Sequence, residues 1–323
     1  MAWPIIGVEA GIEPFIAVFL FIIGLIMVIY FAEKLVKGVV GVSLSFGISA
    51  FLISTIFVGF DPENLFVGAT GSAEGLSGIA LGTILGSCMV AIALAFGITA
   101  LFVELKFKEV SKGILMNTFA AVLLLLLLSI DGVISRFDGI ILLVGFAFSV
   151  YYLFKLSKRG LDIKPSGEVK EFSKEKISKW KSTFIFIASL VGIIVGSQLL
   201  ISGAEPIIQF LNLTDTVFGM TILAFLISIE ELARELPAAL KGRSDITFGN
   251  IVGSILHFFL FNAGLIALVN PINVGKQTLL FYFPIVLVTI FVISLFMLKK
   301  KIPRLAGAIF IILYLIFVIG SYV

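Results

Sequence analysis

The sequence has very few of the side chains on which most enzymes and metalloproteins depend. It contains one cysteine, Cys88, and one histidine, His257, among 323 residues. A single cysteine excludes an internal disulfide and a thiolate metal cluster, and a single histidine excludes a metal site built from several imidazoles. We find no nucleophile–base pair, nucleotide-binding loop or redox centre in the sequence. We therefore expect no enzyme activity, no cofactor and no nucleic-acid partner.

Charged residues are also scarce, and this excludes an ordinary soluble protein. Asp, Glu, Lys and Arg make up 13% of the chain and hydrophobic residues 60%, against about 25% and 45–50% in soluble domains. The mean hydropathy is +1.19. The apolar runs are continuous, whereas the strands of a membrane β-barrel alternate apolar and polar residues. The sequence therefore predicts an all-α, polytopic membrane protein, because helices satisfy their own backbone groups in lipid.

About ten apolar runs are long enough to cross a bilayer as helices. They cover residues 14–38, 44–72, 75–103, 111–130, 135–155, 182–208, 214–241, 245–269, 277–298 and 303–322. The only long polar stretch lies between the fifth and sixth runs. We interpret 1–155 as a first five-helix repeat, 156–181 as a linker loop and 182–323 as a second five-helix repeat.

Lys and Arg are distributed unevenly between the two sides of the predicted bundle. Twenty of the 23 basic residues lie in the odd-numbered connections, and only Arg136 and Lys276 lie in the even-numbered ones. Cytoplasmic loops carry the excess of Lys and Arg in membrane proteins. This distribution predicts a multi-pass protein of the plasma membrane with a cytoplasmic central loop and both termini outside. Membrane lipids are then expected partners.

The two halves share a spaced pattern of small residues. The members of the pattern are related by one constant offset in sequence: Gly82 and Gly249, Gly86 and Gly253, and Ser87 and Ser254. Each half has five runs, an odd number, so the second copy must enter the membrane from the opposite side. Inverted repeats of this kind are typical of secondary transporters, whose binding site lies at the midplane.

The stretch SIEELARELPAALKG, residues 228–242, lies in the seventh run and carries four charges within six residues, 230–235. Glu231 and Glu235 are spaced to share one helical face, and Glu230 and Arg234 are spaced for an ion pair that could be purely structural. Because three carboxylates share one guanidinium, we expect the excess charge, Glu231 above all, to bind a cation. Carboxylate and hydroxyl oxygens suit hard cations. The available hydroxyls belong to Ser228, Ser254 and Ser87.

Acidic residues also occur in the first half, in the stretch GFDPENL, residues 59–65. Glu63 is separated from Glu231 by nearly the same offset as the glycine and serine pairs, and it is the first-half candidate for a cation ligand. We expect Asp61 and Glu74 to line an outer entrance or to lie in a solvated connection.

The stretch VFGMTILAFLISIEELARELPAALKGRSDITFGNIVGS, residues 217–254, resembles the second signature repeat of the calcium:cation antiporter superfamily, and in particular its prokaryotic sodium/calcium exchanger branch. The family pattern is Gly-Thr-Ser-Leu-Pro-Glu followed by a helix with Gly-Asn-x-x-Gly-Ser-Asn. The resemblance covers nearly the whole chain. It implies a sodium/calcium-exchanger-like fold and a transport unit of one chain that exchanges Ca²⁺ for Na⁺ or H⁺ by alternating access.

The resemblance also implies roles for individual residues. Glu231 matches the glutamate that coordinates Ca²⁺ in the second repeat, Ser228 and Ser254 match its serines, and Asn250 matches its asparagine. Glu63 matches the first-repeat glutamate, although a second register of the alignment puts Phe66 there. The implied metal ligands are Glu231, Glu63, Ser228, Ser254 and Ser87, with Glu230, Arg234, Glu235 and Asn250 as accessory or salt-bridge residues.

The chain departs from the family pattern at several of these positions. Leu226 to Glu231 lacks the helix-breaking Gly and Pro of the signature, and Phe258 and Ala91 replace polar ligands of relatives. Two alternatives therefore stay open. One is a diverged transporter on this scaffold with another ion or solute, and the other is a non-transporting membrane protein in which the Glu/Arg cluster only locks helices together.

Overall fold

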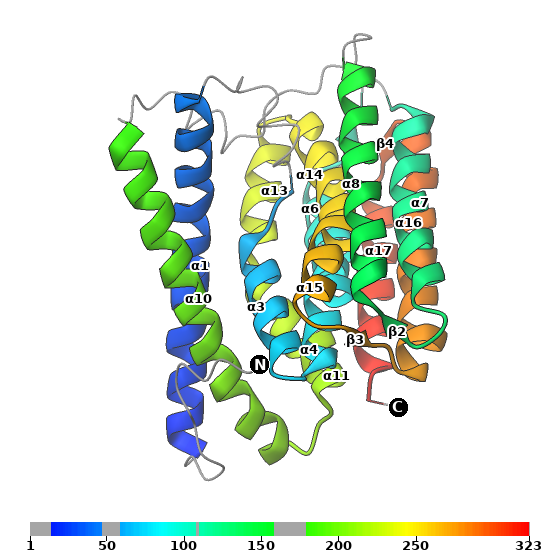
Figure 1. Ribbon diagram of the computed structural model, residues 1–323. Coiled ribbons are helices and arrows are strands. Elements are labelled where there is room, and N and C mark those ends of the chain that lie inside the picture. The colour runs from blue at the N-terminus through cyan, green and yellow to red at the C-terminus, as the bar shows by residue number, and fades with distance from the viewer. Residues whose placement is uncertain (1–13, 47–58, 108–109, 158–178, 323) are drawn as a thin grey trace.

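The computed structural model describes residues 14–46, 59–107, 110–157 and 179–322. Within these ranges the chain is a bundle of helices (Figure 1). The predicted second span, 44–72, is described only at its two ends. Most of the predicted linker loop, 156–181, lies outside the described residues.

The described helices follow the predicted runs closely. The first half contains α1 (Pro14–Ser45), α3 (Pro62–Ala73), α4 (Ser77–Leu81), α5 (Ser87–Met89), α6 (Phe96–Phe102), α7 (Lys112–Leu128) and α8 (Arg136–Ser157). The second half contains α10 (Lys179–Phe210), α11 (Asp215–Phe218), α12 (Ala224–Ser228), α13 (Glu230–Leu240), α14 (Ser244–Leu256), α15 (Ala263–Val269), α16 (Phe283–Leu298) and α17 (Arg304–Ile319). Five π-helical segments connect some of them: Gly82–Gly86, Val90–Ala95, Gly219–Leu223, His257–Asn262 and Thr278–Tyr282.

Six helices of the described chain are long and apolar enough to cross a membrane, and a seventh span results if one bent pair is counted as one. Two further apolar helices, α7 and α17, are shorter, and α3 has 12 residues. The helical membrane fold agrees with the sequence prediction at this level, and the ten individual crossings remain a prediction.

The span predicted over 214–241 is bent by 48° between α12 and α13. The bend falls at Ile229, although the chain has neither Gly nor Pro there. Beyond it, Glu230 and Glu231 form the first turn of α13. Acidic side chains favour a helix N-terminus, where unpaired N–H groups and the helix dipole attract negative charge. The charged pair thus starts a new helix inside the membrane-spanning segment.

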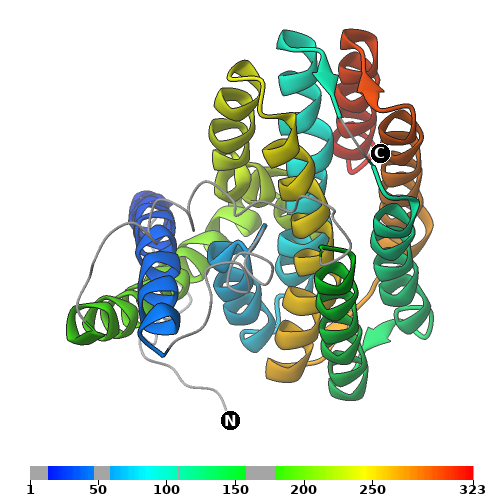
Figure 2. The ribbon, with the colours of Figure 1, turned by 90° about the horizontal axis from the view of Figure 1, so that it is seen from above.

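The helices fall into a large bundle and a separate pair. In the view from above, α1 and α10 lie together at one side of the molecule (Figure 2). The remaining helices surround two rods, Ser77–Phe102 and Ile246–Val269, whose apolar windows are 94% and 83% buried. These rods carry the two Gly-x-x-x-Gly-Ser patterns of the sequence. The predicted repeat pattern therefore lies in the core and not on the lipid-facing surface.

Two short strand pairs depart from a purely helical fold. β1 (Leu105–Lys106) pairs with β4 (Lys301–Ile302), and β2 (Val133–Ile134) pairs with β3 (Ile272–Asn273), both antiparallel. The pairs lie at opposite ends of the bundle (Figure 1). The prediction of an all-α chain missed them because two-residue strands leave no periodicity in a sequence. Each pair ties a connection of the first half to one of the second.

Candidate functional site

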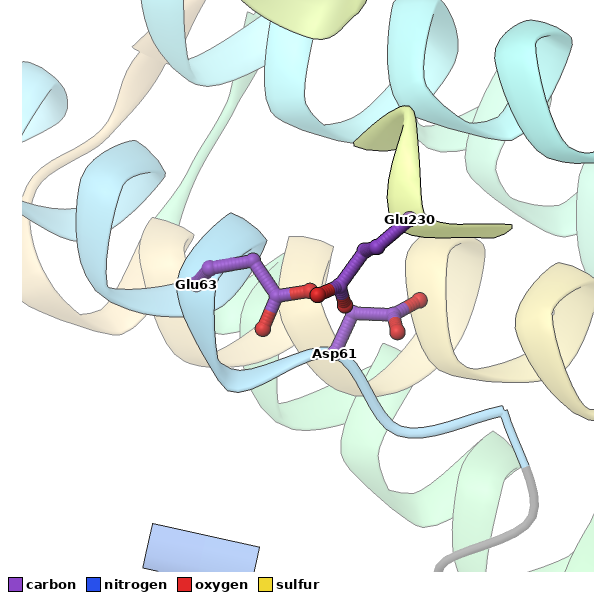
Figure 3. Close-up of side chains that lie close together, drawn as sticks. All are labelled: Asp61, Glu63 and Glu230. Atoms are coloured by element: carbon purple, nitrogen blue, oxygen red, sulfur yellow. The ribbon is translucent and has the colours of Figure 1, made fainter. Parts of the chain in front are cut away.

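The candidate site forms where the start of α3 meets the break between α12 and α13. The chain enters α3 with Asp61 at the N-cap position and Pro62 in the first turn. Proline is suited to that turn because its missing N–H would have no helical partner there. Glu63 and Glu230 point toward one another from α3 and α13, with Asp61 beside them (Figure 3). Two segments from different halves of the chain thus bring three carboxylates together.

These three carboxylates form a compact group. One oxygen from each of Asp61, Glu63 and Glu230 lies within 4.8 Å of the others. Asp61 and Glu63 are each 1% exposed. Asp61 Oδ2 and Glu63 Oε2 are buried and have no hydrogen-bond partner among the described residues. Buried carboxylate oxygens without partners are unfavourable in a membrane interior unless they bind a cation or a proton.

Arg234 binds the same group from one side. Its Nη1 lies 2.6 Å from Asp61 Oδ1 and 3.3 Å from Glu231 Oε1, and its Nη2 lies 2.5 Å from Glu230 Oε1. The contacts to Glu230 and Glu231 follow from helical spacing, since these residues lie one turn before Arg234. The contact to Asp61 joins residues 173 positions apart. Arg234 therefore connects the two halves of the chain at the site.

Glu231 and Glu235 share one amide. Asn250 Nδ2 of α14 donates to Glu231 Oε2 at 2.7 Å and to Glu235 Oε1 at 3.1 Å. Both glutamates are 1% exposed. The predicted shared face of Glu231 and Glu235 is thus present, and Asn250 lies against it. The amide adds no charge, and Arg234, which contacts Glu231, supplies a positive charge beside this pair of carboxylates.

Asn64 connects the predicted serines of the two halves. Its Oδ1 accepts a hydrogen bond from Ser87 Oγ at 2.5 Å, and its Nδ2 donates to Ser228 Oγ at 3.3 Å. All three residues are at most 1% exposed. A buried polar set of this kind is stable only when its members satisfy one another. The two serines therefore lie at the site, but an asparagine lies between them.

Ser254 lies close to the same region through its backbone. Gly59, with φ +71°, brings the chain before α3 so near to Ser254 that a Cβ at position 59 would lie 2.2 Å from the Ser254 nitrogen. Only glycine combines this backbone angle with such a close approach. The Ser254 hydroxyl is buried and has no hydrogen-bond partner among the described residues.

Asp61 and Asn64 are the site residues that the sequence interpretation missed. The expectation that Asp61 lies at an outer entrance or in a solvated connection is wrong, because the residue is buried against Arg234. Glu74 does lie at the surface, where it accepts a hydrogen bond from Gln198. The signal was available in the constant offset between the halves, which relates Asn64 to Glu231 and Asp61 to Ser228. The sequence interpretation aligned Glu63 with Glu231, whereas the constant offset aligns Asn64 with Glu231, one position further along the chain.

The arrangement suits a hard cation. Oxygens that coordinate Ca²⁺ lie about 2.3–2.6 Å from it, so ligands on opposite sides are about 5 Å apart. The ligand oxygens of Asp61, Glu63 and Glu230 all lie within 4.8 Å of one another, inside that limit. Serine hydroxyls and an amide lie nearby, and these groups are also ligands for Ca²⁺ or Na⁺.

Comparison with known proteins agrees with this chemistry. The family described as sodium/calcium exchanger protein matches residues 16–155 and 181–323. An uncharacterized membrane protein of Methanocaldococcus jannaschii is 29% identical over 304 residues, which cover 92% of this chain and 95% of that protein. The sodium/calcium exchanger MaX1 of Methanosarcina acetivorans is 26% identical over 140 residues, which cover 43% of this chain and 40% of that protein.

A solved structure shows the same fold. The sodium-calcium exchanger NCX_Mj, soaked with 100 mM Na⁺ and 10 mM Sr²⁺, superposes with a TM-score of 0.59 at 26% identity over 95% of this chain and 99% of that one. The family expected from residues 217–254 is confirmed. The chain is a multi-pass integral membrane protein and a member of the sodium/calcium exchanger family, in the prokaryotic branch of the calcium:cation antiporters.

Proposed function

We propose that the protein is a secondary antiporter that exchanges Ca²⁺ for Na⁺ or H⁺ at the site formed by Asp61, Glu63, Glu230 and Glu231. The observation that supports this most is the meeting of Asp61 and Glu63 with Glu230, whose ligand oxygens lie within 4.8 Å of one another. Two of these carboxylates have a buried oxygen without a partner among the described residues. Ser87, Ser228 and Ser254 are further proposed ligands, with Glu235 and Asn250 as supporting residues.

Coupling in this proposal arises from competition. Ca²⁺ and the counter-ion need the same carboxylate oxygens, so the site holds one or the other in each half of the cycle. A carboxyl group can also accept a proton directly, and a proton needs no further ligands. The site then opens in turn to each side of the membrane, and only an occupied site reorients. The two fluxes become linked without any covalent chemistry.

We further propose that the fold is an inverted repeat of five spans in each half, ten spans in all, with units 1–155 and 182–323 joined by a linker loop over 156–181. The constant offset supports it, because it relates Asn64 to Glu231 as well as the glycine and serine pairs. The strands support it too, since the starts of β1 at Leu105 and of β3 at Ile272 are related by the same offset. The two pairs lie at opposite ends of the bundle (Figure 1), as an inversion requires.

The proposed orientation follows the basic residues. The central loop and the end of the bundle with β1 and β4 lie in the cytoplasm, and both termini lie outside the plasma membrane. Lys106 and Lys301 pair in register there, near the headgroups of the membrane lipids. One chain contains both halves of the site, so we propose a monomeric transport unit.

Radioactive Ca²⁺ uptake into proteoliposomes tests the function. Uptake is driven in parallel vesicles by an outward Na⁺ gradient and by an outward H⁺ gradient. We expect uptake under at least one gradient, and its loss in Glu231→Gln and in Glu63→Gln, because each change removes a charged ligand. Glu205→Gln is the matched control, since Glu205 is exposed at the surface of α10, and it should retain wild-type uptake.

The same variants separate transport from a purely structural role. If the Glu/Arg cluster only locks helices together, wild-type vesicles take up no Ca²⁺ under either gradient. Glu231→Gln should then lose thermal stability only, because Arg234 loses part of its compensation. Uptake of a different ion under the same gradients would instead identify a diverged transporter. Either result would overturn the proposal of Ca²⁺ exchange.

A further inference from the structure

Arg234 is the one feature of the site that a cation-binding function does not explain. A guanidinium among cation ligands repels the cargo, yet Arg234 contacts Asp61, Glu230 and Glu231 at 2.5–3.3 Å. Arg remains protonated in proteins, so this positive charge is permanent. A transported ion leaves the site in every cycle, whereas Arg234 stays attached to α13.

The contacts of Arg234 use only some of the carboxylate oxygens at the site. Arg234 uses Oδ1 of Asp61, Oε1 of Glu230 and Oε1 of Glu231. Asp61 Oδ2 and Glu63 Oε2 have no partner among the described residues. The guanidinium thus binds one oxygen of each of these three carboxylates, and it leaves Asp61 Oδ2 and Glu63 Oε2 for another cation.

Charge balance explains why such a group is useful. Five carboxylates gather here, those of Asp61, Glu63, Glu230, Glu231 and Glu235. Without a positively charged neighbour, these carboxylates would attract more than one divalent ion, or they would bind a single ion too tightly to release it. A fixed positive charge lowers the affinity for every mobile cation, because like charges a few ångströms apart repel strongly in a poorly screened site. Release to the other side of the membrane then becomes faster.

We propose that Arg234 is a resident counter-cation of the transport site. It fills one of two cation positions permanently, leaves the position bounded by Asp61, Glu63 and Glu230 for the transported ion, and keeps the affinity for that ion low enough for turnover. This inference rests on the proposed function, and it adds that a positive charge of the chain itself takes the place of a second bound cation.

Equilibrium binding of radioactive Ca²⁺ to the purified, detergent-solubilised protein tests this. Wild-type protein should bind one Ca²⁺ per chain. Arg234→Gln should bind Ca²⁺ about tenfold more tightly or better, since it removes a like charge next to the site, and should gain a second Ca²⁺ per chain. Arg234→Lys keeps the charge and should keep the wild-type stoichiometry of one.

A second pair of variants covers the case in which Arg234→Gln does not fold. Glu235→Gln combined with Arg234→Gln removes one charge of each sign and leaves Asp61, Glu63, Glu230 and Glu231 intact. It should bind Ca²⁺ about tenfold more tightly than Glu235→Gln alone, for the same electrostatic reason. Equal or weaker binding in a folded variant would mean that Arg234 only positions the carboxylates, and the inference would be overturned.

The outcomes separate this inference from the function on which it rests. If wild-type protein binds Ca²⁺ and Arg234→Gln leaves the affinity unchanged or weakens it, only the resident counter-cation is overturned. Absence of Ca²⁺ binding by folded wild-type protein overturns both.

Discussion

Asn64 links polar side chains of the two halves by hydrogen bonds. The offset that relates the halves pairs it with Glu231, so the first half carries an amide at the position where the second half carries a carboxylate. The amide accepts from Ser87 and donates to Ser228, which a carboxylate could not do. The acidic groups of the first half are displaced to Glu63 and Asp61. The site is therefore asymmetric in charge although its spacing is symmetric.

Asn64→Asp should destabilise the protein in Ca²⁺-free buffer. Aspartate keeps the acceptor for Ser87 but cannot donate to Ser228, and it adds a buried negative charge. We expect a loss of about 1–3 kcal/mol, the usual cost of a buried group left unsatisfied. Ca²⁺ should restore part of the loss and raise the Tm more than it does in wild-type protein, because binding stabilises the folded state.

Thermal unfolding in detergent, with and without Ca²⁺, measures both effects. Asn273→Asp is the control, since Asn273 is exposed in β3, and its Tm should match that of the wild type. If the Tm of Asn64→Asp does not change, the hydrogen bonds of Asn64 contribute nothing to stability.

At the scale of the helix, two glycines allow the central elements to cross in contact. A Cβ on Gly82 would lie 2.2 Å from the carbonyl carbon of Gly219, and a Cβ on Gly219 would lie 2.5 Å from the Gly78 oxygen. Small residues permit such close approach of membrane helices. This crossing fixes the rod Ser77–Phe102 against the helix that leads to Ser228, and so it fixes Ser87 relative to Ser228.

Gly82→Ala should therefore destabilise the fold. The added methyl meets the backbone of Gly219, and backbone cannot move as a side chain can. We expect a cost of about 1–3 kcal/mol or more, as for overpacked cores. Gly275→Ala is a matched control, because a Cβ there meets nothing within 4 Å. Thermal unfolding of both variants checks this, and equal Tm values would contradict the proposed role of the crossing.

At the scale of the whole molecule, the basic residues and the helix directions predict a single orientation. Lys276 and Lys299 lie at the two ends of one helical segment that is long and apolar enough to cross a membrane, Thr278–Leu298. Both are exposed. The excess of basic residues on the side of Lys299 predicts that this end lies in the cytoplasm. The native Cys88 is buried, so it gives little background in a labelling experiment.

Lys276→Cys should react with a membrane-impermeant maleimide on intact cells, and Lys299→Cys should react only after the membrane is opened. Both substitutions lie in exposed connections and should leave transport unchanged. The opposite labelling pattern would reverse the proposed topology. Labelling of both variants on intact cells would rule out a membrane span over Thr278–Leu298.

Local properties of the sequence were enough to determine the class of the protein and most of its helices. Hydropathy acts within a run of about 20 residues, so the predicted runs match the described helices closely. The charged run over 228–242 marked the site for the same reason, since buried charge in a membrane is costly wherever it occurs. The family resemblance of 217–254 likewise depends on consecutive residues.

Only the tertiary structure decided which side chains meet. Asp61 binds Arg234 across 173 residues and Asn64 binds Ser228 across 164, and no local pattern specifies such pairs. The bend at Ile229 and the strand pairs also depend on neighbours distant in sequence. Composition therefore determined that the chain lies in a membrane and carries charge there, and packing between the two halves decided that three carboxylates and one guanidinium share a single site.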